Sequence, residues 1–179
     1  MRSNAVDGAL AALDAAVSRL ARVDLDGLAH VELLAATRMQ HRLVCRMQAQ
    51  RTRFFSVVRS RGAVIAADAP STAAWLRTEL RLPDGVAQLR AATVTEVLPA
   101  VARAYVRGDF GLEHVEAIAT VARDFRPSAL VRADAQFALE AGRLTPDGLR
   151  RVATRLREET SRRRDETSSS GELSARDET

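Results

Sequence analysis

One stretch, Leu28–Arg61, with the sequence LAHVELLAATRMQHRLVCRMQAQRTRFFSVVRSR, decides the fold class of this chain. Its apolar and its charged residues each recur with the period of a helix, and Gly62 follows as a stop signal. We therefore predict one long helix over this stretch. At 100° per residue, its apolar residues cluster on one side. They are Ala36, Leu43, Val44, Met47, Phe54 and Val58.

A second side of the same helix carries arginine within an arc of roughly 80°. Its members are Arg38, Arg42, Arg46 and Arg53, with Arg59 and Arg61 at the end of the helix. No Asp or Glu occurs from residue 33 to 67, although charged residues make up 28% of the chain. Exposed arginines on helices are normally interleaved with Glu, because opposite charges at i, i+4 support the helix. This acid-free arginine side has two interpretations. Its positive field attracts phosphate or an acidic partner, or it is an ordinary face exposed to solvent.

The composition of the whole chain favours a helical globular protein. The 179 residues are 46% hydrophobic and only 4% aromatic. Alanine is the commonest residue, and because it favours helix over strand, an all-β fold is nearly excluded. The single cysteine, Cys45, excludes an intramolecular disulfide and a cysteine-based zinc site, and it fits a reducing compartment, so we expect a cytoplasmic location. No apolar run is long enough to span a membrane, and no membrane partner is expected.

Further helices are predicted on both sides of the long one. Asn4 is expected to cap a first helix over roughly residues 5–22. Its apolar stripe is Val6, Leu10, Leu13, Val17 and Leu20. After Gly62, residues 63–67 are predicted to be a connector rather than a strand, because one short strand cannot build a sheet.

Six further helix starts are predicted, five of them from capping and proline chemistry and the one at Leu112 from the apolar residues that follow it. They lie at Pro70-Ser71-Thr72, Leu82-Pro83-Asp84, Pro99, Leu112, Pro127-Ser128 and Thr145-Pro146-Asp147. The expected inward anchors are Trp75, Leu76, Leu80, Val86, Leu89, Val115, Ile118, Leu149, Val152 and Leu156. Residues 1–160 thus predict an all-α multi-helix bundle, and the polar residues 161–179 a disordered tail.

Several short motifs between residues 71 and 151 resemble those of a known family. They are Ser71-Thr72-Ala73-Ala74-Trp75-Leu76, Leu98-Pro99, Ala104 with Gly108, His114-Val115, Leu144-Thr145-Pro146 and Leu149-Arg150-Arg151. In this order they resemble the N-terminal helical part of the 13E12 repeat family, domain of unknown function 222, over roughly residues 20–160. The resemblance implies a helical domain associated with HNH endonucleases and mobile elements. Family members continue into a metal-binding nuclease module, whereas this chain continues into Arg162-Arg163-Arg164 and a polar tail, so we expect a truncated member.

No catalytic or metal site is predicted. An HNH triad cannot be drawn, because Asn4 is the single Asn of the chain. His30 and His41 are separated by roughly 16 Å of helix, too far for one metal ion, and His114 is expected to cap or pack in its turn. Cys45 has no general base among its helical neighbours and is predicted to be a small packing residue. We therefore expect no enzyme activity and no cofactor.

Two functions remain open from the sequence. The first is a non-catalytic domain that binds the phosphate backbone of nucleic acid through guanidinium groups. The candidate residues are Arg38, Arg42, Arg46, Arg53, Arg59 and Arg61. Four such contacts would give a salt slope of about −3.6. The pair Pro99–Arg107 and Leu112–Arg123 has the outline of a helix-turn-helix, although a helical hairpin is the commoner arrangement. The second function is a protein-interaction module that docks onto a second copy or a full-length relative.

Overall fold

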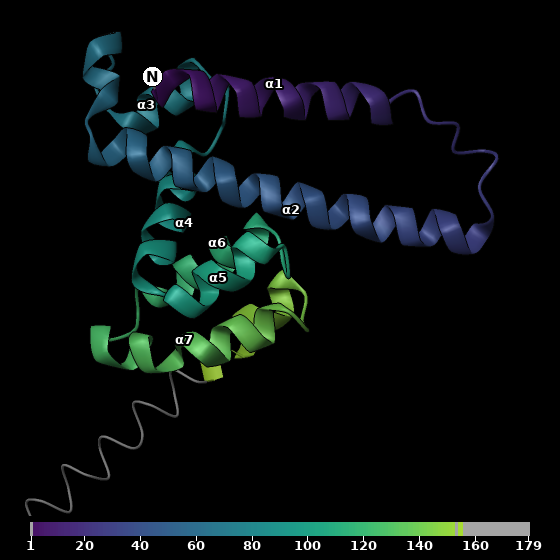
Figure 1. The fold of residues 1–179 in the computed structure, drawn as a ribbon. Helices are drawn as coiled ribbons and strands as arrows, with labels where there is room; N and C mark the ends of the chain where they lie inside the picture. The colour runs from purple at the N-terminus through teal and green to yellow at the C-terminus, as the bar shows by residue number, and fades with distance from the viewer. Residues whose placement is uncertain (1, 153, 156–179) are drawn as a thin grey trace, which may run out of the picture. The chain divides into compact units, whose positions relative to one another are not determined.

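The computed structural model describes residues 2–152, 154 and 155 (Figure 1). These residues form helices and connecting turns without any strand, which confirms the predicted all-α class. The chain divides into two compact units, Met1–Gln40 and His41–Thr179, and each is described by itself. Within the described part, no helix combines the length and the apolar character needed to cross a membrane.

The first unit holds α1 (Arg2–Leu20) and the beginning of α2 (His30–Ser60). The predicted cap at Asn4 is wrong, because α1 already includes this residue. The predicted apolar stripe of α1 is largely exposed, and Leu13 is its one half-buried member. At the start of α2, the Glu32 carboxylate accepts a hydrogen bond from the backbone N–H of Ala29 at 3.0 Å. An acidic side chain thus caps the long helix at its positive end.

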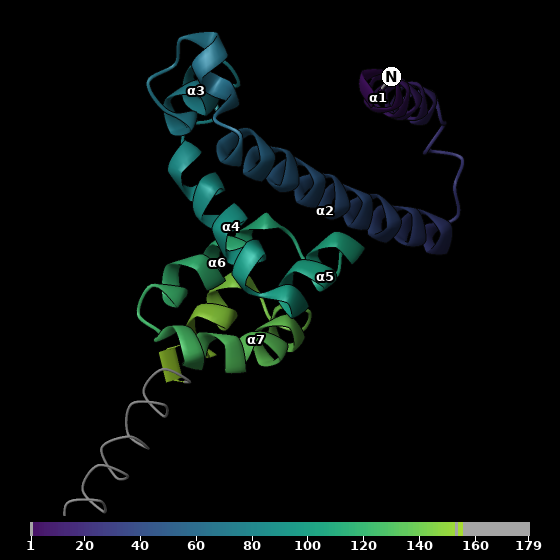
Figure 2. The ribbon, with the colours of Figure 1, turned by 60° about the vertical axis from the view of Figure 1, so that its left-hand side comes forward.

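Four helices supply most of the core of the second unit. They are α4 (Gly85–Val97), α5 (Pro99–Arg107), α6 (Leu112–Ala122) and α7 (Pro127–Ala141). The central helix is α6, which contacts α4, α5 and α7 and buries most of its residues (Figures 1 and 2). Buried alanines on α4, α5 and α6 allow close helix packing, and Leu98, Tyr105 and Phe137 fill the larger spaces.

Local capping explains where several of these helices begin. The Ser71 hydroxyl accepts from the N–H of Ala74 at 3.1 Å and starts α3 (Thr72–Thr78). The Asp84 carboxylate accepts from the N–H of Ala87 at 2.8 Å and starts α4. The Thr145 hydroxyl accepts from the N–H of Gly148 at 3.2 Å where residues 146–152 are helical. These three predicted starts are confirmed.

Some predicted anchors are wrong. Val86 is 53% exposed, because α4 instead turns Gly85, Gln88, Ala91, Ala92 and Val94 inward. Leu80 lies beyond the end of α3 and is exposed. Leu149 is buried and Val152 half-buried, whereas Leu156 and the predicted tail 161–179 lie outside the described residues.

Residues 63–67, predicted to be a connector, form the short 3₁₀ helix η1 (Ala63–Ala67). Gly62, the predicted stop signal of the long helix, precedes it with φ 59°. A left-handed backbone conformation suits glycine, which has no Cβ to clash with the next carbonyl. The predicted end of α2 at Gly62 is therefore confirmed, and residues 63–67 connect α2 to α3 without forming a strand, as predicted.

The predicted apolar side of α2 is not the side that is buried in the second unit. The buried residues of α2 are Cys45, Ala49, Thr52 and Phe55. Leu43, Met47 and Phe54, which belong to the predicted apolar side, are 41–50% exposed. The prediction fails because hydropathy assigns polar side chains to solvent, whereas α2 uses several of them for hydrogen bonds to the rest of this unit.

Candidate nucleic-acid interface

Polar contacts fix the second half of α2 on the helices of its unit. The Gln48 side-chain carbonyl accepts a hydrogen bond from the backbone N–H of Leu112 at 3.0 Å, at the start of α6. The hydroxyl groups of Thr52 and Tyr105 lie 3.3 Å apart in the buried interior. Burial raises the pKa of the Tyr105 hydroxyl to about 12, because it disfavours the charged phenolate. These contacts determine which arginines of α2 face the unit and which face solvent.

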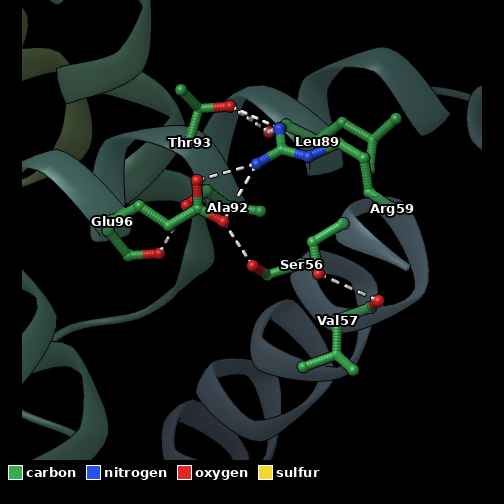
Figure 3. A network of polar contacts seen from close by, with 9 residues as sticks. Ser56, Val57, Arg59, Leu89, Ala92, Thr93 and Glu96 are labelled. Atoms are coloured by element: carbon green, nitrogen blue, oxygen red, sulfur yellow. Dashed lines mark hydrogen bonds and ion pairs between the residues drawn. The ribbon is translucent and has the colours of Figure 1, made fainter. Parts of the chain in front are cut away.

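Arg59 lies on the side of α2 that faces α4, and its guanidinium is bound there (Figure 3). Its Nη2 donates to both carboxylate oxygens of Glu96, at 2.8 and 2.9 Å. Its Nη1 donates to the Thr93 hydroxyl at 2.6 Å and to the Leu89 carbonyl at 3.3 Å. The Ser56 hydroxyl donates to the same carboxylate. Arg59 therefore neutralises Glu96, an acid of the same unit, and has little capacity left for phosphate.

Arg42 is partly bound by residues at the end of α5 and in the turn that follows it. Its Nε donates to the backbone carbonyl of Arg107 at 3.2 Å, and its Nη2 lies 3.6 Å from Asp109 Oδ1. The other oxygen of Asp109 accepts from Arg107. The Arg42 side chain is still 55% exposed, so its guanidinium remains accessible from solvent.

The remaining candidates are exposed arginines. Arg38, in the first unit, is exposed. In the second unit, Arg46, Arg53 and Arg61 are exposed, and their side chains form no hydrogen bond or ion pair with any described residue. We call these three residues the arginine row. Arg46 and Arg53 are about 10 Å apart along the axis of α2, and Arg61 follows directly after its last residue.

Two further arginines lie close to Arg42 and were not predicted from the sequence. Arg107, at the end of α5, and Arg143, after the end of α7, line an open hollow together with Arg42 and Asp109. No sequence signal connects these residues, because they are distant along the chain and meet only where their helices pack. A basic residue in the last turn of a helix also has an ordinary explanation in the helix dipole.

The helix-turn-helix outline does not present a recognition helix. The turn after α5 is closed by Gly108 with φ 78°, as predicted. The second helix of the pair, α6, is the central helix of the core. Its buried residues are Leu112, Val115, Ala117, Ile118, Ala119 and Val121. A helix with so many inward residues has little surface for reading a DNA groove, and the pair is a packed helical hairpin.

His114 has a structural explanation. Its Nε2 donates to the Leu144 carbonyl at 2.9 Å, and the centroid of its ring lies 5.8 Å from the centroid of the Phe110 ring. The prediction that His114 packs in its turn is thus confirmed. Among the residues that the structure describes, no three His, Cys, Asp or Glu side chains are grouped so that they could hold a metal ion.

Cys45 does have a base beside it, contrary to the prediction. Its Sγ lies 3.6 Å from Nε2 of His41, one helical turn earlier. However, the residue is only 1% exposed. Burial, and secondarily the nearby Glu113 carboxylate, raises the pKa of the Cys45 thiol. The thiol is therefore held in its protonated form, which is a poor nucleophile.

We expect Cys45 to resist thiol reagents in the folded protein. Because the thiol is both buried and protonated, its reaction with an aromatic disulfide reagent near neutral pH should be at least about a hundredfold slower than in denaturant, a factor that corresponds to local opening costing about 3 kcal/mol. Absorbance of the released thiolate measures both rates. Equal rates in native buffer and in denaturant would contradict the buried position of Cys45.

Comparisons with other proteins do not test the predicted family. No family model matches the chain, and no curated protein or solved structure matches it either. The resemblance to the 13E12 repeat family therefore remains a prediction from the motifs between residues 71 and 151.

Proposed function

We propose that the second unit binds the phosphate backbone of nucleic acid without catalysing a reaction. The observation that carries this proposal is the arginine row, Arg46, Arg53 and Arg61, which is exposed and unpaired among the described residues. Each guanidinium can donate two parallel hydrogen bonds to phosphate oxygens. Residues 33–67 contain no acid, so α2 itself carries no carboxylate beside Arg46 and Arg53.

The proposed binding is independent of base sequence. Base readout needs an element that enters a groove, and the best sequence candidate, α6, is buried in the core. Arg59 is not part of the proposed surface, because Glu96 already binds it. Three phosphate contacts by the row correspond to a salt slope of about −2.7, compared with about −3.6 for four.

The double substitution Arg46→Ala/Arg53→Ala is expected to weaken duplex binding and to flatten its salt dependence. Two lost phosphate contacts should reduce the magnitude of the slope by about 1.8. Fluorescence anisotropy with a labelled duplex, titrated between about 50 and 200 mM salt, measures both quantities.

The matched control is Arg77→Ala/Arg132→Ala, which removes the same charge from exposed positions on α3 and α7. It should leave the slope unchanged. No binding of the wild-type chain to duplex at low salt would reject the proposal. Equal losses in the two double variants would show that only net charge matters and would also reject it.

A second candidate function, self-association, is favoured by one observation. Leu43, Met47, Phe54 and Val57 of α2 are 41–50% exposed in the second unit. Clustered exposed apolar side chains mark interaction surfaces, and a second copy of the chain would present the same surface in a two-fold arrangement. Light scattering without nucleic acid tests this function: a dimer mass supports it, and a monomer mass at high concentration rejects it.

A further inference from the structure

A hollow of about 700 Å³ opens between α2, at Arg42, and the C-terminal ends of α5 and α7. We call it the α2–α5–α7 hollow. Its charged lining consists of Arg42, Arg107, Asp109 and Arg143, and most of the remaining lining is alanine and glycine. Its volume lies within the range of about 300–1,000 Å³ that small-ligand sites occupy. Small lining residues leave the charged groups accessible to a ligand.

The charges of the hollow are unbalanced. Asp109 lies between two guanidiniums: its Oδ2 accepts from Arg107 Nη2 at 2.6 Å and Nε at 3.0 Å, and its Oδ1 lies 3.6 Å from Arg42 Nη2. The side chain of Arg143 makes no hydrogen bond or ion pair with any described residue. The lining of the hollow thus holds one carboxylate and three guanidiniums. Arg42 and Arg107 also keep 55% and 59% of their side chains exposed, so both can still reach a ligand.

The walls of the hollow are positioned by the backbone. Gly108, in the turn after α5, lies so close to α2 that an added Cβ would be 2.6 Å from the Arg42 carbonyl oxygen. The Arg42 side chain donates from Nε to the Arg107 carbonyl at 3.2 Å across the same gap. Because these contacts hold α2 against α5, two of the three guanidiniums are placed before any ligand binds. A preorganised site loses less conformational entropy on binding.

We propose that the α2–α5–α7 hollow binds a phosphate group in its dianionic form, as found at the 5′ end of a strand or on a free nucleotide. Three guanidiniums and one carboxylate leave two positive charges, which match a terminal phosphate better than a singly charged phosphodiester. Guanidinium is the side-chain group best suited to bind phosphate in this way. The inference goes beyond the proposed function, because a nucleotide would bind here even if the arginine row bound nothing.

Two arms of one experiment distinguish the sources of the phosphate. Anisotropy compares a labelled single strand that ends in a 5′-phosphate with the same strand that ends in a 5′-hydroxyl. Calorimetry compares adenosine 5′-monophosphate with adenosine. We expect the phosphorylated member of at least one pair to bind about tenfold more tightly, which corresponds to about 1.4 kcal/mol. A preference for the phosphorylated strand in the anisotropy measurement assigns the hollow to strand ends. A preference for the monophosphate in calorimetry, without one in anisotropy, assigns it to free nucleotides.

The variant Arg143→Ala tests whether the hollow causes the preference. This substitution removes no side-chain hydrogen bond or ion pair between described residues, so the fold should be retained, and the phosphate preference should fall to less than about threefold. Arg132→Ala, which removes an exposed arginine on α7, is the control and should keep the preference.

Equal affinities within both ligand pairs, or a preference that survives Arg143→Ala, would overturn the inference. The failure of the proposed function gives a different pattern. In that case the wild-type chain does not bind duplex, and Arg46→Ala/Arg53→Ala has no effect, whatever the ligand pairs show.

Discussion

Substitution of Asp134 by alanine is expected to lower the free energy of unfolding by about 3 kcal/mol, since two charge-assisted hydrogen bonds are lost together. Asp134 lies on α7 and is 7% exposed. Its carboxylate accepts from the backbone N–H groups of Ala100 at 2.7 Å and Val101 at 3.0 Å. These groups belong to the first turn of α5, where Leu98 occupies the capping position and has no side-chain acceptor. A residue from another helix therefore caps α5 and satisfies the positive end of its dipole.

Thermal and urea unfolding measure this effect. A loss of about 3 kcal/mol corresponds to a fall in Tm of about 6–12 °C for a chain of this size. Asp134→Asn keeps one acceptor oxygen and should lose about half as much. Glu79→Ala removes an exposed acid at the end of α3 and should change stability by less than about 0.5 kcal/mol. If Asp134→Ala and Glu79→Ala unfolded at the same temperature, the cap between α7 and α5 would be disproved.

Asp134 shows what a single sequence reveals about helix boundaries and what it does not. The starts at Ser71, Asp84 and Thr145 were predictable, because each capping side chain lies within three residues of the N–H that it binds. The start of α5 was predictable from Pro99 alone. Its cap was not, because the acceptor lies 34 residues further along the chain.

The side of α2 that packs against the core was not predictable for a similar reason. Gln48, Thr52 and Arg59 are polar, and periodicity places polar residues in solvent. Their partners lie on α4, α5 and α6, so burial depends on tertiary contacts. Nothing in the sequence distinguishes Arg53 from Arg59, yet the first is exposed and the second is bound to Glu96. The candidate interface therefore retains only part of the predicted arginine side.

Substitution of Gly108 by alanine is expected to cost about 2–3 kcal/mol of unfolding free energy, through two separate effects. A side chain at φ 78° is strained by about 1–2 kcal/mol. In addition, the new Cβ would lie 2.6 Å from the Arg42 carbonyl oxygen and 2.8 Å from Arg46 Cγ. The Arg46 side chain can move aside, but the carbonyl belongs to the backbone of α2, so the helix itself must shift away from α5.

Gly62→Ala separates these effects. Gly62 has a similar backbone conformation, with φ 59°, but a Cβ added there would meet the flexible end of a side chain, Ile65 Cδ1, at 3.3 Å. This control should therefore report the conformational strain alone, and urea unfolding should show Gly108→Ala to be less stable than Gly62→Ala by about 1 kcal/mol. The shift of α2 also moves Arg42 away from Arg107. Of the two substitutions, only Gly108→Ala should therefore weaken the phosphate preference of the α2–α5–α7 hollow. Equal destabilisation by the two substitutions, with the preference intact in both, would mean that the turn after α5 does not set the position of α2.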